Sequence, residues 1–480
     1  MTVNLATRKV LPLCVDLDGT LIHSDLLLES ALLLIKQRPL YILSMFLWLL
    51  QGKAVLKAQI AARVNLSPAA LPYNNELLEW LRAERQAGRP LWLCTAANEK
   101  LANAVAAHLD LFEGVVASDP TRNLAGDAKA SELVRLFGER GFDYCGNEVR
   151  DLKVWQHSHG AVVVNATSAL AKAAAAEGAA VVGSFPSHGS RWRAVLRALR
   201  PHQWAKNALI FAPLLAAHQA RSLHQLSAVA MATVAFCLCA SSVYILNDLL
   251  DLEADRAHPR KSRRPFASGA LSIKAGLLLC PLLLLGGVAL AAFLPGKFQL
   301  VFATYYVLTC AYSFDLKGRV IVDTLSLAAL YTLRIIAGAA AVDVPLSFWM
   351  LLFSIFLFLS LAFVKRYAEL DSLRRRARLR AAGRGYHVED LGVLQSLGSA
   401  SGYMSILVLA LYINSPEVAA LYQRPKMIWL LCVLMLYWIS RVWMKAHRGE
   451  MHDDPVVFAL KDRVSLAIVG LAGLTAILAI

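Results

Sequence analysis

Charged residues are scarce in this chain. Aspartate, glutamate, lysine and arginine make up 17% of its 480 residues, whereas hydrophobic residues make up 57%. That balance is too apolar for an ordinary soluble enzyme and indicates a membrane protein. The apolar residues are concentrated from about Gln203 onward, because the chain from Met1 to about Phe185 has the composition of a soluble α/β protein. We therefore expect a soluble part followed by a membrane part.

Metal-binding cysteine pairs and an export signal are also lacking. The eight cysteines are scattered without the spacing of metal ligands, so we expect small buried side chains in a reducing compartment. The first residues, MTVNLATRKVLPLCVDLDGT, lead directly into a strand and a turn, unlike a secretory signal. The soluble part is therefore expected on the cytoplasmic side.

Nine apolar runs follow the soluble part. They cover residues 203–219, 223–246, 273–294, 298–313, 321–341, 346–364, 396–414, 426–444 and 462–480. Most approach the length of about 20 residues that a spanning helix needs, whereas the first and fourth are shorter and would tilt or begin at the interface. The sequence therefore predicts an all-α bundle of nine transmembrane helices.

Basic residues are distributed unevenly between the two sets of loops. The loops on one side carry only Arg221, Lys297, Arg424 and Lys426, whereas the loops on the opposite side carry 20 lysines and arginines. Because basic loops stay in the cytoplasm, this bias predicts an inner-membrane protein with the amino-terminal domain in the cytoplasm and the carboxyl terminus outside. The net charge of +15 is then explained without a nucleic-acid partner.

Carboxylates follow the first predicted strand of the soluble part. The run VLPLCVDLDGT is continuously apolar, as a buried parallel strand should be, and ends in Asp16 and Asp18. The strand in RPLWLCTAAN brings Thr95 to the same edge of the sheet, and FDYCGNEVRD brings Asn147 and Asp151. Ligands bind at the carboxyl ends of strands in open α/β sheets, so these side chains predict a site.

The order DxDGT, Thr95, Lys129 in GDAKASELVRLFG, and GNEVRD resembles the haloacid dehalogenase (HAD) superfamily of phosphatases, over most of residues 10–180. The resemblance implies a Rossmann-like α/β domain in which Asp16 is the nucleophile and Asp18 the general acid and base. Thr95 and Lys129 would hold the phosphoryl oxygens. Asp16, the backbone carbonyl of Asp18, and Asp151 would hold Mg²⁺.

One position departs from the HAD pattern. The family usually has GDxxxD where this chain has GNEVRD, so Asn147 replaces a charged partner of the magnesium ion. Two interpretations remain, a phosphatase and a domain that binds phosphate without turning it over.

A helical cap is expected at about residues 26–63. Within it, the apolar stretch from Leu40 to Leu50 is too short to span a membrane, which leaves open a cap that leans on the membrane. We place the HAD-like domain at residues 1–184, a linker rich in glycine, serine and proline at residues 185–194, and the membrane domain at residues 195–480.

An acidic motif, NDLLDLEADRAHP, follows the second apolar run. On a helix, Asn247, Asp248, Asp251 and Asp255 would point into one cavity. Clustered carboxylates at a membrane edge repel each other unless they hold a cation, and hard oxygen ligands suit Mg²⁺. The alternative to a metal site is a solvated helix end that Arg256 and Arg260 cap.

NDxxDxxxD in this place resembles the UbiA superfamily of membrane prenyltransferases, across residues 195–480. Further segments resemble the branch of decaprenyl-phosphate phosphoribosyltransferases: RPHQWAKNALIFAPL, NDLLDLEADRAHPRKSRRPFASG, YSFDLKGRVIVDTLSLAALYTLRIIAGAAA, VKRYAEL and DDPVVFALKDRVS. The resemblance implies a Mg²⁺-dependent transfer of 5-phosphoribose from phosphoribosyl diphosphate (PRPP) to a polyprenyl phosphate. In that branch the diphosphate donor is a sugar and the lipid is the acceptor.

The loop after the sixth run departs from the prenyltransferase pattern. A second DxxxD motif is expected there, whereas the chain reads KRYAELDSLRRRARLR. Lys365 and Arg366 take the place of magnesium-binding aspartates, which suits substrates with extra phosphates. For the arginines from Arg374 to Arg384 we favour contact with lipid headgroups.

A mechanism follows from the resemblance and these charges. Asp248, Asp251 and Asp255 would hold Mg²⁺ on the donor diphosphate, nearby cations would neutralise the departing diphosphate, and the acceptor phosphate would attack without a strong general base. The residues expected to bind substrate are Asn247, Lys206, Asn207, Lys261, Arg264, Lys317, Arg334, Lys365, Arg366, Tyr367 and Glu369. Weaker candidates are Asp323, Asp453, Asp454 and Asp462, of which Asp462 could instead form an ion pair with Arg463.

The two domains suggest one joint function, in which the soluble domain removes the 5-phosphate from the lipid that the membrane domain makes. Two alternatives remain open: a prenyltransferase acting on an aromatic acceptor, and a transporter or scaffold with a regulatory phosphate-binding domain. An acidic cluster at a membrane edge, and not at its middle, argues against transport. The length of the lipid, decaprenyl or undecaprenyl, and assembly into a homo-oligomer also stay open.

Overall fold

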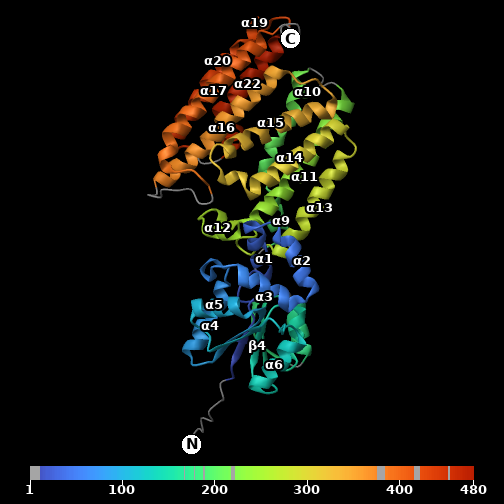
Figure 1. Cartoon of the computed structure of the whole chain (residues 1–480), viewed down its shortest axis with the longest axis vertical. Helices are drawn as coiled ribbons and strands as arrows, with labels where there is room; N and C mark the ends of the chain where they lie inside the picture. Colours follow the sequence, from blue (N-terminus) through green and yellow to red (C-terminus); the bar gives the residue numbers. More distant parts are fainter. Residues whose placement is uncertain are drawn as a thin grey trace, which may run out of the picture. The chain divides into compact units, whose positions relative to one another are not determined.

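The computed structural model describes residues 11–166, 168–177, 179–186, 190–217, 222–375, 384–415, 422–451 and 454–479 (Figure 1). The chain divides into two compact units, the first combining Met1–Leu199 with Ile245–Leu279 and the second combining Arg200–Tyr244 with Cys280–Ile480. The acidic motif thus belongs by its contacts to the same unit as the amino-terminal part of the chain. The domain boundaries predicted from the sequence assign each domain one continuous segment of the chain, and they stay a prediction.

A six-stranded parallel sheet forms the centre of the first unit. Its strands are β1 (Leu13–Val15), β2 (Leu91–Asn98), β3 (Gly114–Ser118), β4 (Asp143–Gly146), β5 (Gly160–Ala166) and β6 (Ala180–Pro186). The order β3-β2-β1-β4-β5-β6 places β1 beside β4, where the chain order reverses and ligands bind in folds of this kind. The predicted Rossmann-like α/β fold is confirmed, whereas membership of the HAD superfamily stays a prediction.

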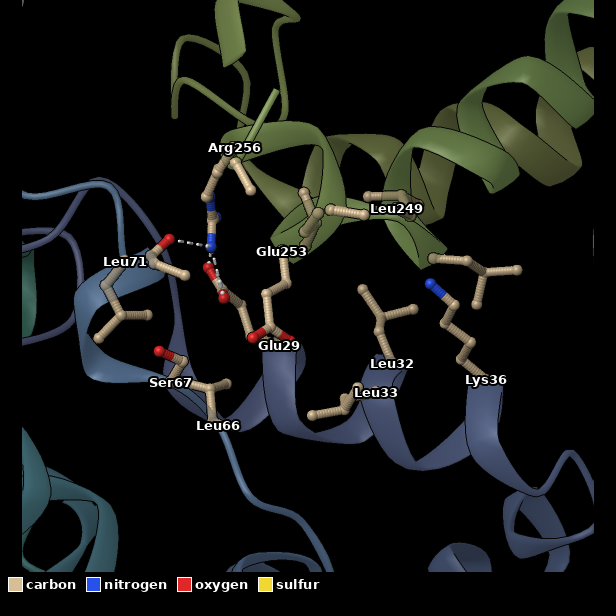
Figure 2. Close-up of a pocket in the computed structure, with 15 residues that line it drawn as sticks. Glu29, Leu32, Leu33, Lys36, Leu66, Ser67, Leu71, Leu249, Glu253 and Arg256 are labelled. Atoms are coloured by element: carbon tan, nitrogen blue, oxygen red, sulfur yellow. Dashed lines mark hydrogen bonds and ion pairs between the residues drawn. The ribbon is translucent and has the colours of Figure 1, made fainter. Parts of the chain in front are cut away.

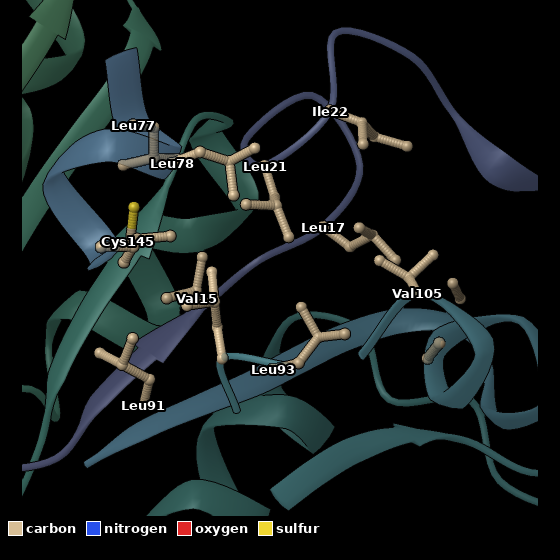
Figure 3. Close-up of a cluster of buried hydrophobic side chains, with 14 of the residues drawn as sticks. Val15, Leu17, Leu21, Ile22, Leu77, Leu78, Leu91, Leu93, Val105 and Cys145 are labelled. Atoms are coloured by element: carbon tan, nitrogen blue, oxygen red, sulfur yellow. The ribbon is translucent and has the colours of Figure 1, made fainter. Parts of the chain in front are cut away.

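Both faces of this sheet are buried. Val15 of β1 packs on one side, with Leu77 of α4 (Asn75–Gln86) and Val105 of α5 (Glu99–Leu109), as Figure 3 shows. The neighbouring Cys14 packs on the other side with residues of α6 (Asp127–Phe137). Because alternate side chains point to opposite buried faces, the strands are continuously apolar in the sequence.

Four α-helices lie between β1 and β2 in the chain, and three of them fall within residues 26–63: α1 (Leu26–Gln37), α2 (Tyr41–Leu50) and α3 (Lys53–Arg63). The sequence predicts a helical cap at about residues 26–63, and the role of these helices as a cap stays a prediction. The carboxylate of Asp25 accepts a hydrogen bond from the backbone N–H of Leu28 at 3.2 Å and caps α1.

The membrane part consists of helices. They are α11 (Leu223–Leu250), α13 (Ile273–Ala291), α14 (Gly296–Phe314), α15 (Val322–Val342), α16 (Phe348–Arg374), α17 (Leu391–Ile413), α20 (Leu430–His447) and α22 (Arg463–Ala479), with shorter elements between them. Within the described residues, six helices are long and apolar enough to cross a membrane, those at residues 223–250, 273–291, 322–342, 348–374, 388–413 and 426–447. A multi-pass helical membrane domain is confirmed, but the predicted count of nine spans is not.

The first apolar run accounts for part of the difference. Of residues 203–219, those that the structure describes contribute to a 3₁₀ helix, η3 (Pro201–Phe211), and to the short α10 (Ala212–Ala216) rather than to a long α-helix. This segment approaches α15 very closely, because a Cβ on Gly338 would come within 2.0 Å of the carbonyl oxygen of Ile210. The fourth and ninth runs form α14 and α22, neither of which is among the six.

Candidate functional site

The acidic motif lies where α11 ends. Asp248 is in the last turn of α11, and Asp251 precedes α12 (Leu252–Arg256) with φ −105° and ψ 18°. The helix is therefore interrupted at Asp251, and the continuous helical face that the spacing predicted is wrong. Asp248 and Asp255 are nevertheless both buried.

Two carboxylates of the motif converge on one guanidinium group. Nη1 of Arg264 lies 3.1 Å from Oδ1 of Asp248 and 2.6 Å from Oδ2 of Asp255. Burial raises the pKa of Asp255, and the charge of Arg264 opposes that shift. The point between these oxygens therefore favours positive charge, and hard oxygen ligands suit Mg²⁺. In the part of the chain that the structure describes, no three histidine, cysteine or acidic side chains are grouped closely enough to hold a metal ion.

Asp251 points to a different cation. Its Oδ1 accepts a hydrogen bond from Nζ of Lys36, in the last turn of α1, at 2.7 Å. Asn247 is half-buried in the last turn of α11. Lys261 is half-buried in η4 (Lys261–Arg263), and its positive charge acts on Asp255. The structure thus brings Asp248, Asp255, Arg264 and Lys261 together and directs Asp251 toward α1.

Arg256 joins the same segment to α1 through a buried ion pair. Its Nη1 and Nη2 donate to the two carboxylate oxygens of Glu29 at 2.8 and 2.6 Å, and its Nε donates to the carbonyl oxygen of Ala267 at 2.9 Å. Figure 2 shows the pair beside a cavity of about 260 Å³ that Leu32 and Leu249 also line. The side chain of Arg256 is only 9% exposed, so its interpretation as a solvated helix cap is wrong.

In the second unit, two lysines share one carboxylate. Nζ of Lys206 on η3 and Nζ of Lys365 on α16 lie 2.8 and 2.9 Å from Oδ2 of Asp454. The hydroxyl of Tyr331 donates to the other oxygen of Asp454 at 3.2 Å. Burial would raise the pKa of Asp454, but Lys365 and Lys206 hold it well below its usual range. From the sequence Asp454 is only a weaker candidate, but the structure places it in contact with Lys206 and Lys365, which the sequence predicted to bind substrate.

Arg334 on α15 extends this group. Its Nε donates to Oδ1 of Asn207 and its Nη2 to the hydroxyl of Tyr305, both at 2.9 Å. Its Nη1 donates to the carbonyl oxygen of Leu330 at 2.6 Å. The guanidinium lies 5.3 Å from the centre of the Tyr331 ring. These contacts hold Arg334 in one orientation within an apolar helical unit.

The two sets of contacts form one group, which we call the polar centre: Lys206, Asn207, Tyr331, Arg334, Lys365 and Asp454. Three cations in it face one carboxylate. An excess of buried positive charge is costly unless an anion offsets it, and phosphate groups accept hydrogen bonds from arginine and lysine. The polar centre is therefore suited to bind a phosphorylated substrate, and it brings together four of the residues that the sequence predicted to bind one.

Arg366 lies in a separate network. It is paired with Asp323 on α15, and its Nη1 donates to Glu369 at 2.6 Å. Its Nη2 also donates to the hydroxyl of Tyr312 at 3.0 Å, and Arg384 lies 3.2 Å from Glu369. With 1% of its side chain exposed, Arg366 is placed to tie α16 to α15. The adjacent cations Lys365 and Arg366, predicted to act together, thus contact different carboxylates.

Other predicted residues lie elsewhere in the second unit. The hydroxyl of Tyr367 is 3.0 Å from Nδ1 of His447, and Lys317 is half-buried in η5 (Leu316–Gly318). Asp462 forms a bidentate ion pair at 2.6 and 3.0 Å with Arg441. Asp453, Arg376, Arg378 and Arg380 lie outside the described residues.

In the first unit, the phosphatase-like residues meet at the carboxyl ends of β1 and β4. Nζ of Lys129 donates to Oδ1 of Asp16 and to the hydroxyl of Tyr144, both at 2.8 Å. That hydroxyl donates to Asp151 at 3.1 Å, whose other oxygen accepts the backbone N–H of Asn147 at 2.8 Å. Burial lowers the pKa of Lys129, but Asp16 and Asp151 outweigh it and raise the pKa. The space between the two carboxylates therefore favours a cation.

The remaining residues of the HAD-like pattern lie around this group. Burial, reinforced by Asp25, raises the pKa of Asp18 to about 8, which favours the protonated form that a general acid needs. Thr95 is buried, with its hydroxyl accepting the N–H of Ala97 at 3.0 Å. The amide oxygen of Asn147 accepts a hydrogen bond from Thr20 at 3.2 Å, so this side chain holds the DxDGT turn.

These carboxylates line a cavity of about 330 Å³. Its other walls carry cations that the sequence analysis did not single out: Lys53, Lys57, Arg150 and Lys274. Lys57 donates to Asn123 at 2.7 Å, and Lys274 lies 3.3 Å from Asp25. Lys274 belongs to the first turn of α13, one of the six apolar helices. Because these residues are far apart in the chain, no local pattern could have identified them.

Comparison with known proteins gives one family and several relatives. Residues 208–466 match the UbiA prenyltransferase family. An uncharacterized protein, y4nM, of Sinorhizobium fredii is 37% identical over 458 residues, which cover 95% of this chain and 89% of that protein. The nodulation protein NoeC of Azorhizobium caulinodans is 40% identical over 280 residues, 57% of this chain and 90% of that protein. A decaprenyl-phosphate phosphoribosyltransferase of Mycolicibacterium smegmatis is 32% identical over 276 residues, 56% of this chain and 87% of that protein.

Substitution of Asp454 tests the charge balance of the polar centre. Asp454→Asn leaves two ammonium groups without their shared carboxylate, so we expect a loss of stability of roughly 2–3 kcal/mol, measured by thermal unfolding in detergent. Inorganic pyrophosphate should restore part of the loss, because a bound anion replaces the carboxylate.

The matched control is Asp343→Asn. Asp343 pairs with Lys297 at 2.8 Å, but these side chains are 71% and 75% exposed, so the control should unfold like the wild type. Equal unfolding temperatures for Asp454→Asn and the control would contradict the assignment.

Proposed function

The chain belongs to the UbiA prenyltransferase family, and from this membership we propose that it moves 5-phosphoribose from PRPP to a polyprenyl phosphate, with Mg²⁺, at the cytoplasmic face of the membrane. The observation that carries this proposal is the excess of positive charge in the polar centre. A donor with a 5-phosphate and an acceptor with a phosphate supply the anions that such a site needs. The name of the mycobacterial relative supports the same reaction.

The acidic motif would hold the metal ion. Asp248 and Asp255 would bind Mg²⁺, because their oxygens already converge on the guanidinium of Arg264. Bound there, Mg²⁺ would supply positive charge for the diphosphate that leaves. Arg264 and Lys261 would add hydrogen bonds to the same group, and Asp251 would join when Lys36 releases it.

Lys206, Lys365 and Arg334 would bind the phosphate groups of the substrates. Asn207 and Tyr305 accept hydrogen bonds from Arg334 and so fix the direction of its guanidinium. As the bond from C1 of the ribose to the diphosphate loosens, the sugar gains oxocarbenium character, and an oxygen of the lipid phosphate forms the new bond. That oxygen is already an anion, so no residue is needed to remove a proton.

The amino-terminal domain would remove the 5-phosphate from the lipid product. Asp16 would be the nucleophile, Asp18 would protonate the leaving hydroxyl, and Lys129 would hold the phosphoryl oxygens. Lys274, on the first turn of an apolar helix, lines the same cavity, which suits a phosphate carried on a membrane lipid. The match with y4nM over 95% of the chain also supports joint action of the two parts in one protein.

Loss of one acidic side chain tests the transfer step. We expect Asp255→Asn to lower the rate of transfer from labelled PRPP to decaprenyl phosphate at least about 100-fold, because the diphosphate loses its cation site. Glu253→Gln, on the same short helix and solvent-exposed, should keep the wild-type rate. Product from labelled prenyl diphosphate and an aromatic acceptor, and none from PRPP, would favour a prenyltransferase and contradict the proposal.

A second substitution tests the phosphatase step. Membranes with Asp16→Asn should accumulate lipid that keeps its 5-phosphate, because the nucleophile is lost while transfer continues. Mass spectrometry of the lipid extract measures this. Asp110→Asn is the control, since Asp110 is exposed and its φ of 51° is one that asparagine tolerates. Identical lipids from Asp16→Asn and the control would show that the amino-terminal domain does not act on this product.

A further inference from the structure

Helix α2 of the first unit presents apolar side chains that none of the described residues of this unit covers. It has no buried residue, and its exposed apolar side chains, with the residue before it, are Leu40, Ile42, Leu43, Phe46, Leu47, Leu49 and Leu50. Phe46 is 63% exposed and Leu50 71%. Exposed apolar side chains gathered on one helix mark an interaction site on a protein.

The inner face of α2 is apolar as well. Tyr41, Met45 and Trp48, spaced by one helical turn, pack on a small core that α1 and α3 provide. The guanidinium of Arg63 lies 4.7 Å from the centre of the Trp48 ring. No charged residue occurs between Tyr41 and Leu50. A helix that is hydrophobic all round requires an apolar environment on its outer side too, which water does not provide.

The contacts of α1 place α2 close to a lipid bilayer. At one end of α1, Lys36 contacts Asp251, the residue that directly follows the apolar helix α11. At the other end, Asp25 contacts Lys274 in the first turn of α13. The ends of two membrane-spanning helices are thus bound to α1. Tyr41 follows Lys36 by five residues, so α2 begins within about 18 Å of the residue that contacts the end of α11.

The charge around α2 complements an anionic membrane. From residue 30 to residue 75 the chain contains no acidic residue, but it contains Lys36, Arg38, Lys53, Lys57 and Arg63. Arg38 and Lys53 are exposed and flank the helix on either side. Basic residues beside an apolar helix attract anionic headgroups while the apolar side chains enter the acyl region.

We propose that α2 is an interfacial anchor that lies in the bilayer crossed by α11 and α13, with Leu43, Phe46 and Leu50 in contact with acyl chains. The partner is the lipid surface itself, with anionic phospholipids at Arg38 and Lys53. The cap then sits at the lipid boundary, where a phosphate on a membrane lipid can enter the cavity behind it; this last consequence rests on the proposed phosphatase function.

Photo-crosslinking on the full chain tests the anchor. The protein carrying Phe46→p-benzoylphenylalanine, and separately Leu43→p-benzoylphenylalanine, is reconstituted in nanodiscs of phosphatidylethanolamine and phosphatidylglycerol and irradiated. We expect covalent phospholipid adducts at both positions by mass spectrometry, and unchanged thermal unfolding. The matched control is Leu136→p-benzoylphenylalanine, because Leu136 is also exposed but lies on α6, at the far end of this unit from α2 in Figure 1. There the lipid adduct should fall to background.

Three results would overturn the proposal. Crosslinks from positions 43 and 46 to a second copy of the chain, without lipid adducts, would assign the surface to a dimer. The absence of any adduct at both positions would show that this surface of α2 faces water. Equal lipid adducts at positions 46 and 136 would show only random encounters with the disc. Transfer and phosphatase activities are not read out, so failure of the anchor is distinguishable from failure of the proposed function.

Discussion

Carboxylates beside a membrane-spanning helix require positive charge, and much of this structure follows from how that requirement is met. Asp248, Asp251 and Asp255 come at the end of α11, where burial makes an isolated charge costly. Arg264 serves two of them, and Lys36 serves the third. The cation at Arg264 marks where a metal ion with a diphosphate would be stable. The cation at Lys36 explains why the segment after α11 belongs to the amino-terminal unit.

In the second unit the excess charge is positive, and it requires negative charge nearby. Lys206, Arg334 and Lys365 bring positive charge into an apolar helical bundle, and Asp454 balances only part of it. The proposed transfer between two phosphorylated substrates would use such an excess, because rigid cations stabilise anions without reorganisation. Arg366, which is fully paired with Asp323 and Glu369, instead holds two helices together.

Local sequence patterns predicted those features that depend on residues close together in the chain. The strands that lead to Asp16 and Thr95 were recognisable from their apolar runs. Resemblance to a family identified Lys206, Asn207 and Arg334, which the structure brings together around Tyr331. Contacts between distant segments were not predictable: Arg256 and Glu29 are 227 residues apart, and Lys274 lines a cavity built from residues 16–151. The break at Asp251 and the 3₁₀ helix at Lys206 reflect tertiary contacts that override helical spacing.

Binding of Mn²⁺ tests the central claim most directly. Electron paramagnetic resonance on the purified chain with PRPP, in an Asp16→Asn background that disables the other acidic site, reports bound Mn²⁺. The account predicts a bound ion in this protein and its loss when Asp248→Asn and Asp255→Asn are added. Unchanged Mn²⁺ binding after those two substitutions would contradict the claim that the acidic motif exists to hold a metal ion.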